Sequence, residues 1–224
     1  MMIPVSPEEV TAAWLSEVLG VEVLRAELAP VGTGQTAATY RVAVHYRDQG
    51  ALPSTFVVKL PAQDPDVRQR VALSYRSEHA FYTGVAGTVN VPLARCHHCA
   101  IDDDGQRFVL LLADMAPAEQ GDQIRGCTPA QARLAVTALA GLHGPRWCDP
   151  AWLGFAGTVM PRPDVATAHG LADITKLAVA TTLEKLGGRM SLADRNTVLE
   201  SADLIADWLL TAPERFSLLH GDYR

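Results

Sequence analysis

The sequence has no apolar run that approaches the ~20 residues a transmembrane helix needs. Residues 1 to 10 also lack the basic start and apolar stretch of an export signal. Basic residues are few, with 19 Lys and Arg against 25 Asp and Glu and a formal net charge of -6. No broad basic field results, which argues against nucleic acid as a partner. We expect a cytoplasmic protein that binds neither membranes nor nucleic acid.

Cysteine is scarce as well. The 224 residues hold four, and without an export signal we expect them to be reduced. Cys96 and Cys99 form a C-x-x-C pair, which is half of the ligand set of a structural zinc site. Such a site needs a second pair at suitable spacing, and Cys127, His143 and Cys148 do not provide one. We therefore predict no metal site and assign the pair to a strand and a turn.

The composition is that of an ordinary globular protein, with 48% hydrophobic and 20% charged residues, and the chain is long enough for one larger domain or two small lobes. Apolar runs predict strands in its first half, and capping residues followed by helical spacing predict helices. The predicted strands are Val21 to Ala29, Tyr40 to Tyr46, Thr55 to Leu60, Val89 to Ala100 and Arg107 to Ala113. The predicted helices start at Ser6 (ending at Gly20), at Asp64, at Thr128 (ending at His143), at Asp164 (ending at Leu186) and at Ser191 (ending at Leu210).

A glycine-rich segment, Gly32 to Ala37, lies between the first two predicted strands. As a string it matches the dinucleotide-binding fingerprint, but that motif requires a helix directly after it, and an alternating strand follows instead. This context indicates a hairpin loop that covers nucleotide phosphates with backbone N–H groups. A glycine-rich hairpin without a ligand is the alternative.

Lys59 is the one charged residue of the predicted strand Thr55 to Leu60, and Glu78 lies on the apolar face of the helix that follows. An unpaired carboxylate turned toward a core would be costly, so Glu78 needs a cation. Lys59, on the preceding strand, is the obvious candidate. We predict an ion pair between Lys59 and Glu78; the alternative is a solvated helix edge that carries Glu78.

The chain ends with His220-Gly221-Asp222-Tyr223-Arg224, after an apolar run, Phe216 to Leu219, that predicts a short buried strand. Kinase-like phosphotransferases present a catalytic base in a His-x-Asp loop, with a metal-holding Asn five residues after the Asp. Here Asp222 is present, but the Asn position would fall three residues beyond Arg224. We therefore expect a C-terminally truncated chain that cannot complete the reaction alone.

Taken together, these segments resemble the aminoglycoside phosphotransferase and choline kinase-like superfamily, nearest its ecdysteroid kinase-like branch. The resemblance implies an α+β, protein kinase-like fold with ATP held between two lobes. The sheet-rich, nucleotide-binding lobe would span residues 1–115, and an incomplete helical lobe residues 116–224. The resemblance is carried by the Gly32 to Ala37 loop, Lys59 in its strand, Tyr75 to Tyr82, Leu110 to Pro117, Leu139 to His143 and His220 to Arg224.

The resemblance also implies roles for individual residues. Gly32, Thr33 and Gly34 would flank the phosphates of ATP. Lys59 would contact those phosphates and be held by Glu78. Ala113 and Met115 would offer backbone hydrogen bonds to adenine. Asp222 would orient or deprotonate the hydroxyl group of a small-molecule substrate. Mg²⁺ is implied for the completed enzyme, with its ligands beyond Arg224.

A second hypothesis is a natural short form that binds a nucleotide or a protein without catalysis, because the loop, Lys59 and Glu78 could still hold a nucleotide. A Rossmann oxidoreductase is disfavoured by the strand after Gly34 and by the absence of repeated strand–helix units. A truncated kinase fold would expose apolar faces, so we also expect self-association. The sequence does not identify the substrate.

Overall fold

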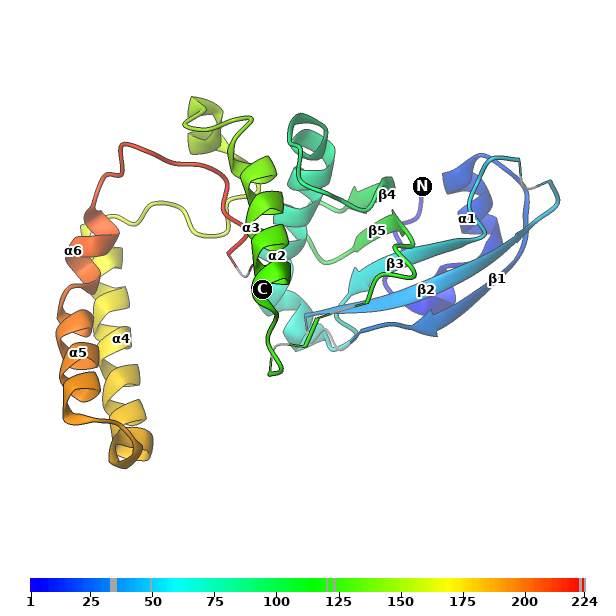
Figure 1. Cartoon of the computed structure of the whole chain (residues 1–224). Helices are drawn as coiled ribbons and strands as arrows, with labels where there is room; N and C mark the ends of the chain where they lie inside the picture. The colour runs from blue at the N-terminus through cyan, green and yellow to red at the C-terminus, as the bar shows by residue number, and fades with distance from the viewer. Residues whose placement is uncertain (33–35, 49, 120, 123, 222, 224) are drawn as a thin grey trace. The chain divides into compact units, whose positions relative to one another are not determined.

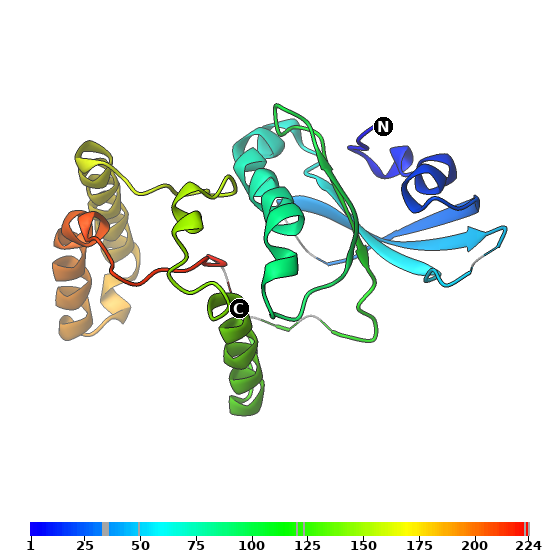
Figure 2. The ribbon, with the colours of Figure 1, turned by 90° about the horizontal axis from the view of Figure 1, so that it is seen from above.

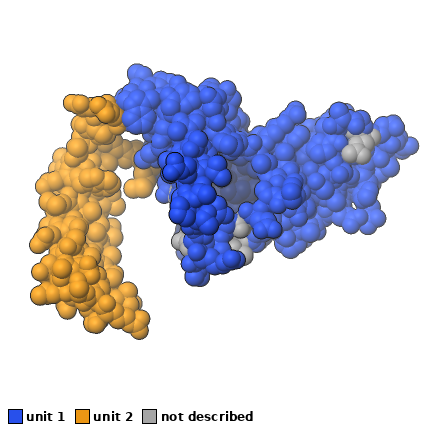
Figure 3. Space-filling model, viewed as in Figure 1, with its two compact units in different colours: residues 1–159, 216–224 blue, residues 160–215 orange. Residues whose placement is uncertain are grey.

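The computed structural model describes residues 1–32, 36–48, 50–119, 121–122, 124–221 and 223. The chain forms two compact units, coloured separately in Figure 3. Unit 1 comprises residues 1–159 and 216–224, and unit 2 comprises residues 160–215.

Unit 1 is built on a five-stranded antiparallel sheet with the strand order β1-β2-β3-β5-β4 (Figure 1). Its strands alternate in the sequence with turns and one long helix, so the predicted α+β class is confirmed. The hairpin of β1 and β2 pairs Pro30 with Tyr40, which excludes the strand–helix unit of a dinucleotide-binding fold. The strands are β1 (Val23–Pro30), β2 (Ala37–Tyr46), β3 (Thr55–Pro61), β4 (Cys96–Ile101) and β5 (Phe108–Ala113).

The two faces of this sheet have different covers, because side chains alternate along each strand. On one face, Val42, Phe56 and Val58 form the main core with Trp14 and Leu15 of α1 (Ala12–Leu19). The opposite face carries a second cluster with Tyr75 of α2 (Pro65–Gly84), and Figures 1 and 2 show the two helices on the two sides of the sheet. Lys59 is on the α2 face, since its neighbours Val58 and Leu60 point into the main core.

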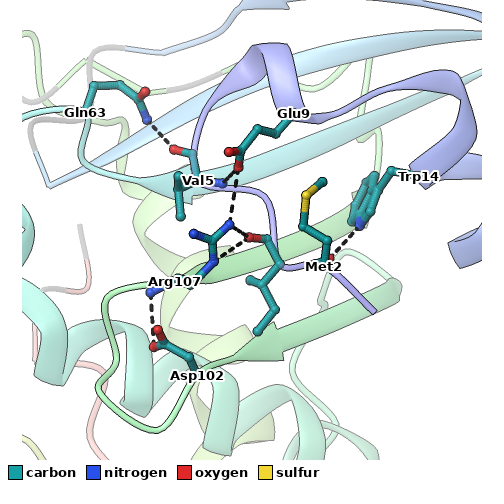
Figure 4. A network of polar contacts seen from close by, with 8 residues as sticks. Met2, Val5, Glu9, Trp14, Gln63, Asp102 and Arg107 are labelled. Atoms are coloured by element: carbon teal, nitrogen blue, oxygen red, sulfur yellow. Dashed lines mark hydrogen bonds and ion pairs between the residues drawn. The ribbon is translucent and has the colours of Figure 1, made fainter.

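The first helix does not start at Ser6 as predicted. Pro7–Glu9 is a short 3-10 turn, the Ser6 side chain caps nothing, and Thr11 caps α1 by accepting a hydrogen bond from Trp14 N at 3.2 Å. The reason is visible in Figure 4: the carboxylate of Glu9 accepts from Val5 N at 2.7 Å and lies 3.5 Å from the Arg107 guanidinium. Glu9 is thus held by partners that local spacing does not reveal.

Arg107 ties the N-terminal segment to the start of β5. Its guanidinium donates two hydrogen bonds to the carbonyl of Ile3, at 2.6 and 3.0 Å. The backbone N–H of Arg107 donates to the Asp102 carboxylate. The backbone N–H of Asp102 donates to the Arg107 carbonyl, which closes the hairpin turn before β5. These bonds place residues 1–10 over the main core, where Val10 is 3% exposed.

The predicted strand from Val89 to Ala100 is too long, because β4 begins only at Cys96. Pro92 removes a backbone donor from the earlier part. The N–H of Asn90 is instead bonded to the carbonyl of Gly141 at 2.9 Å, which holds the segment against α3 (Pro129–His143). The helix α3 has its N-cap at Thr128, the predicted start, and Thr128 and Gln131 form a capping box there.

Gly141 is required by this contact between α3 and residues 90–91. A methyl group there would lie 2.6 Å from the carbonyl oxygen and 2.8 Å from the carbonyl carbon of Asn90. Gly141→Ala is expected to lower the free energy of unfolding by about 1–3 kcal/mol despite the better helix propensity of Ala. Gly170→Ala, whose methyl meets open space, should be neutral or stabilising in the same urea titration. Equal stability of Gly141→Ala and wild type would contradict this packing.

Unit 2 is a helical hairpin of α4 (Val165–Leu186) against α5 (Leu192–Asp203) and α6 (Ile205–Leu210). The predicted helix from Ser191 to Leu210 is interrupted at Leu204, which separates α5 from α6. Small side chains form the seam between the helices, since Ala168, Ala172, Ala202 and Ala206 are the buried residues of these three helices. Larger apolar side chains therefore remain exposed on this unit, including Ile174, Leu177, Leu199 and Trp208.

Candidate active site

The predicted ion pair between Lys59 and Glu78 is present. The Lys59 ammonium on β3 donates a hydrogen bond to Oε1 of Glu78 on α2. The side chains are 27% and 35% exposed, so the pair lies at the edge of the interface between α2 and the sheet. The other carboxylate oxygen, Oε2, is buried without a hydrogen-bond partner among the described residues. The pair therefore offers a partly accessible cation whose direction is set by a fixed carboxylate.

Apolar side chains of the cluster around Tyr75 lie on the same face of the sheet as this pair. Tyr82, one helical turn after Glu78, has its pKa raised to about 12, first by burial and then by the negative charge of Glu78 and the nearby thiols of Cys96 and Cys99. In such surroundings a charge interaction is stronger than in bulk water. A phosphate that reached Lys59 would gain from the same effect.

The glycine-rich segment lies between the paired antiparallel strands β1 and β2 of a hairpin, as predicted. Val31 N donates to Thr39 O at 2.9 Å, so the ladder of β1 and β2 continues up to the loop. Gly32 has φ = 77°, a left-handed conformation that favours glycine. Thr33 and Gly34 lie outside the described residues. The loop leads into β2, and Thr39 of β2 is paired with Lys59 of β3. Lys59 therefore lies on the strand next to the one that follows the loop.

Tyr75 links α2 to the end of this loop, a role that the sequence reasoning missed. Its hydroxyl donates to the carbonyl of Thr36 at 2.5 Å and accepts from the N–H of Ala62 at 2.9 Å. Its ring is 1% exposed and stacks on Phe108, with ring centroids 5.1 Å apart. A tyrosine on the apolar face of a predicted helix is the only signal in the sequence, because its partners lie far away along the chain.

Of the candidate adenine contacts, Ala113 is the last residue of β5 and Met115 lies two residues after it. Ala113 donates its N–H to Arg95 O at 2.8 Å, and Met115 accepts from Ala118 N at 2.9 Å. A base would have to use other backbone atoms, such as the Ala113 carbonyl or the Met115 N–H. Between them, Asp114 binds Arg41 of β2 through two hydrogen bonds at 2.7 and 3.3 Å. This second ion pair fixes the segment to the sheet and was not predicted.

The Asp114–Arg41 pair predicts a pH dependence of stability. Burial raises the pKa of Asp114, but hydrogen bonds from Arg41 and from Ala116 N outweigh it and hold the pKa below its usual value. A lowered folded-state pKa contributes stability that is present above the unfolded pKa of about 3.9 and lost as pH falls through the folded value. Asp114→Asn should therefore lower Tm at pH 6, and this deficit should shrink as the pH falls to 3.

Thermal unfolding of wild type and Asp114→Asn at both pH values measures this effect. Arg41→Gln serves as the matched variant, because it removes the same pair from the other side and should show the same shrinking deficit. A difference in Tm that stays constant from pH 6 to pH 3 would count against the pair as its cause.

The C-terminal segment lies along α3 and is not the predicted strand. Residues 216–219 form no ladder among the described residues; Phe216 O instead accepts from Cys148 N at 2.9 Å, and Ser217 donates to His143 O at 3.3 Å. An apolar run becomes a strand only where a neighbouring strand offers backbone partners. Further along, Tyr223 donates its hydroxyl to Ala135 O at 2.8 Å. Asp222, the candidate base, lies outside the described residues.

A cavity of about 540 Å³ separates α2 from α3 and the C-terminal segment. Its polar lining includes Glu78 and His220, so the structure brings one predicted site residue and the histidine before Asp222 to the same space. The rest of the lining is mainly apolar, with Phe81, Leu142 and Leu218 as examples.

No cluster of three acidic, His or Cys side chains that could hold a metal occurs in the described part of the chain. No helix among these residues is both long and apolar enough to cross a membrane.

Several solved structures are similar to this chain. A candidate fructosamine-3-kinase from Thermobifida fusca is 20% identical, with a TM-score of 0.44 over 95% of this chain and 66% of its own. The GDP complex of aminoglycoside 2'-phosphotransferase-IIIa is 13% identical, with a TM-score of 0.46 over 87% and 58%. A candidate aminoglycoside phosphotransferase from Ralstonia eutropha is 20% identical, with a TM-score of 0.44 over 95% and 56%. The chain thus spans between about half and two thirds of their lengths.

A comparison with curated proteins gave no match. The family model described as "Phosphotransferase enzyme family" matches residues 27–224, which includes the glycine-rich hairpin, the Lys59–Glu78 pair and the C-terminal segment. The narrower ecdysteroid kinase-like assignment stays a prediction. On this match over most of its length, the chain belongs to the phosphotransferase enzyme family.

Proposed function

We propose that the protein is an ATP-dependent phosphotransferase that acts on a hydroxyl group of a small molecule. The observation that carries the proposal is the ion pair between Lys59 and Glu78, on the strand next to the glycine-rich hairpin, in a member of this family. A lysine whose ammonium is aimed by a carboxylate is suited to contact nucleotide phosphates. A cytoplasmic location, with reduced thiols and a supply of ATP, is part of the proposal.

The remaining candidate residues are proposed to contact the other parts of ATP and the substrate. Backbone N–H groups of Gly32, Thr33 and Gly34 would contact the phosphates, and the segment from Ala113 to Met115 would bind adenine. Asp222 would orient or deprotonate the substrate hydroxyl. Phosphoryl transfer relies on positioning and charge stabilisation. The fixed positions of these groups therefore matter more than any covalent reaction of their own.

The described residues fit the nucleotide better than they fit its metal ion. The Lys59 side chain is partly accessible. Gly32 has a left-handed backbone and no Cβ atom, so a phosphate could approach its backbone closely as well. For Mg²⁺, which proteins often hold by one or two carboxylates together with the phosphates, these residues provide no cluster of ligands. Mg²⁺, with ligands beyond Arg224, and the truncation itself stay predictions.

Transfer of labelled γ-phosphate tests the function. We expect that the protein purified at its native length from its source cells transfers label from ATP to a hydroxyl compound in a small-molecule extract of those cells. Residues 1–224 alone should bind ATP but transfer nothing. Binding at both lengths without transfer at either would favour the alternative, a nucleotide-binding module without catalysis.

Self-association is expected through unit 2. Several apolar side chains of α4 and α6 are exposed, and Ile174, Leu177 and Trp208 are each at least 64% exposed. A second copy that covers this surface would remove apolar area from water. Light scattering should show dimers or larger species that dissociate in Leu177→Glu/Trp208→Glu. A stable monomer of the wild type at high concentration would contradict this expectation.

A further inference from the structure

Two thiols lie on the same face of the sheet as Lys59. Cys96 and Cys99 are three residues apart on β4, and a regular strand would place them on opposite faces. The register is irregular between Cys96 and His98, so that Cys96 is opposite Leu112 and Cys99 is opposite Leu110. Because Leu110 and Leu112 share a face, this bulge turns both sulfur atoms to that face.

The two thiols interact directly. Hydrogen bonding with the Cys99 thiol lowers the pKa of Cys96. The same bond, together with burial and the charges of Cys96 and Glu78, raises the pKa of Cys99. Both side chains are half-buried and free, so neither is used in a disulfide. Cys96 is therefore the thiol that more readily forms the nucleophilic thiolate.

We propose that Cys96 and Cys99 form a redox-active dithiol site that small-molecule disulfides convert to an intramolecular disulfide. The Cys96 thiolate attacks one sulfur of the external disulfide, which forms a mixed disulfide and releases one thiolate. Cys99 then loses its proton, attacks the Cys96 sulfur and releases the second thiol. Two protein thiols and one external disulfide thus become one protein disulfide and two external thiols, so the external disulfide takes up both electrons.

The backbone spacing makes this disulfide a labile one. Cys96 and Cys99 face residues two apart on β5, which corresponds to about 6.6 Å along a strand. Cα atoms joined by a disulfide are usually about 4.4–6.8 Å apart, so the bond can form only near the upper limit. A bond near this limit stores strain and is reduced readily, which suits reversible rather than structural use.

The site lies where a change of shape would reach Lys59. Leu110 pairs with Lys59 on one side and with Cys99 on the other, so the three residues form one row across β3, β5 and β4. Both cysteines, like Tyr82, pack against the cluster that includes Tyr75 of α2, the helix that carries Glu78. Drawing the two sulfurs together would shift β4 against α2. Resting on the proposed function, we expect the oxidised form to bind nucleotide more weakly.

Intact mass under non-reducing conditions tests the site. Cys127→Ser/Cys148→Ser serves as the background, because it leaves only the proposed pair. Incubation with oxidised glutathione should give a species that has lost two hydrogen atoms, with a peptide map that joins Cys96 to Cys99, and dithiothreitol should reverse it. Adding Cys99→Ser should trap one glutathione on Cys96. Two free thiols after incubation, or two attached glutathiones without closure, would overturn the proposal.

Nucleotide affinity of the two forms is a separate readout. A fall of at least about threefold on oxidation, absent in Cys96→Ser, is expected. Equal affinity in both forms would overturn the link to the nucleotide site. If neither form binds nucleotide, the proposed function fails, while the mass result still decides whether the dithiol site exists.

Discussion

Tyr75→Ala is expected to lower the free energy of unfolding by about 3–5 kcal/mol, the cost of removing a buried aromatic side chain. The ring is 1% exposed and stacks on Phe108, so its loss leaves a cavity between α2 and the sheet. Because small domains are stable by only about 5–15 kcal/mol, this variant should be near the limit of folding. Denaturation in urea, followed by circular dichroism, measures the change.

Tyr75→Phe separates the hydroxyl from the ring. It keeps the stacking but leaves the N–H of Ala62 and the carbonyl of Thr36 without their partner, which costs about 1–3 kcal/mol. Tyr46→Phe is the matched control, because the Tyr46 hydroxyl donates an exposed hydrogen bond to Pro53 O and its loss should matter little. If Tyr75→Phe were as stable as wild type, the hydroxyl would not be the anchor of the loop end.

Lys59→Met should weaken binding of ATP about 10- to 150-fold, which corresponds to the loss of a charged hydrogen bond of about 1.5–3 kcal/mol. Met keeps the length of the side chain and removes the charge. Glu78→Gln should have a smaller effect in the same direction, because Lys59 remains but loses the carboxylate that orients it. Titration calorimetry with a non-hydrolysable ATP analogue gives both affinities.

The double variant Lys59→Met/Glu78→Gln tests whether the two residues act as a pair. Once Lys59 is replaced, the further change at Glu78 should have little effect on affinity. Lys185→Met removes a lysine from unit 2 and should bind the analogue as wild type does. Additive losses in the double variant would show that Glu78 acts without Lys59.

The Lys59–Glu78 pair could be predicted because it follows from the side-chain periodicity of one strand and one helix. Alternation in β3 identifies a charged residue among apolar ones, and helical spacing turns Glu78 toward the same interface. The antiparallel hairpin at Gly32 was likewise visible in the strands that flank it. Both predictions needed only segments whose own sequence fixes their conformation.

The features that were missed depend on partners far away in the sequence. The hydroxyl of Tyr75 bonds to Thr36, 39 residues earlier, and Arg107 bonds to Ile3, 104 residues earlier. A helix was predicted to start at Ser6, yet the Glu9 carboxylate near that point accepts from Val5 N and lies beside Arg107. Bulges such as the one between Cys96 and His98 also escape pattern analysis, because a strand's register is set by its neighbour.

The most direct test of the account compares ATP with adenosine as ligands of residues 1–224. If Lys59 and the glycine-rich hairpin hold phosphates, calorimetry should show that ATP binds at least about tenfold more tightly than adenosine, and that Lys59→Met removes this advantage without changing the affinity for adenosine. Equal affinity of wild type for ATP and adenosine, or an advantage of ATP that survives in Lys59→Met, would contradict the assignment of Lys59 as the phosphate-binding residue.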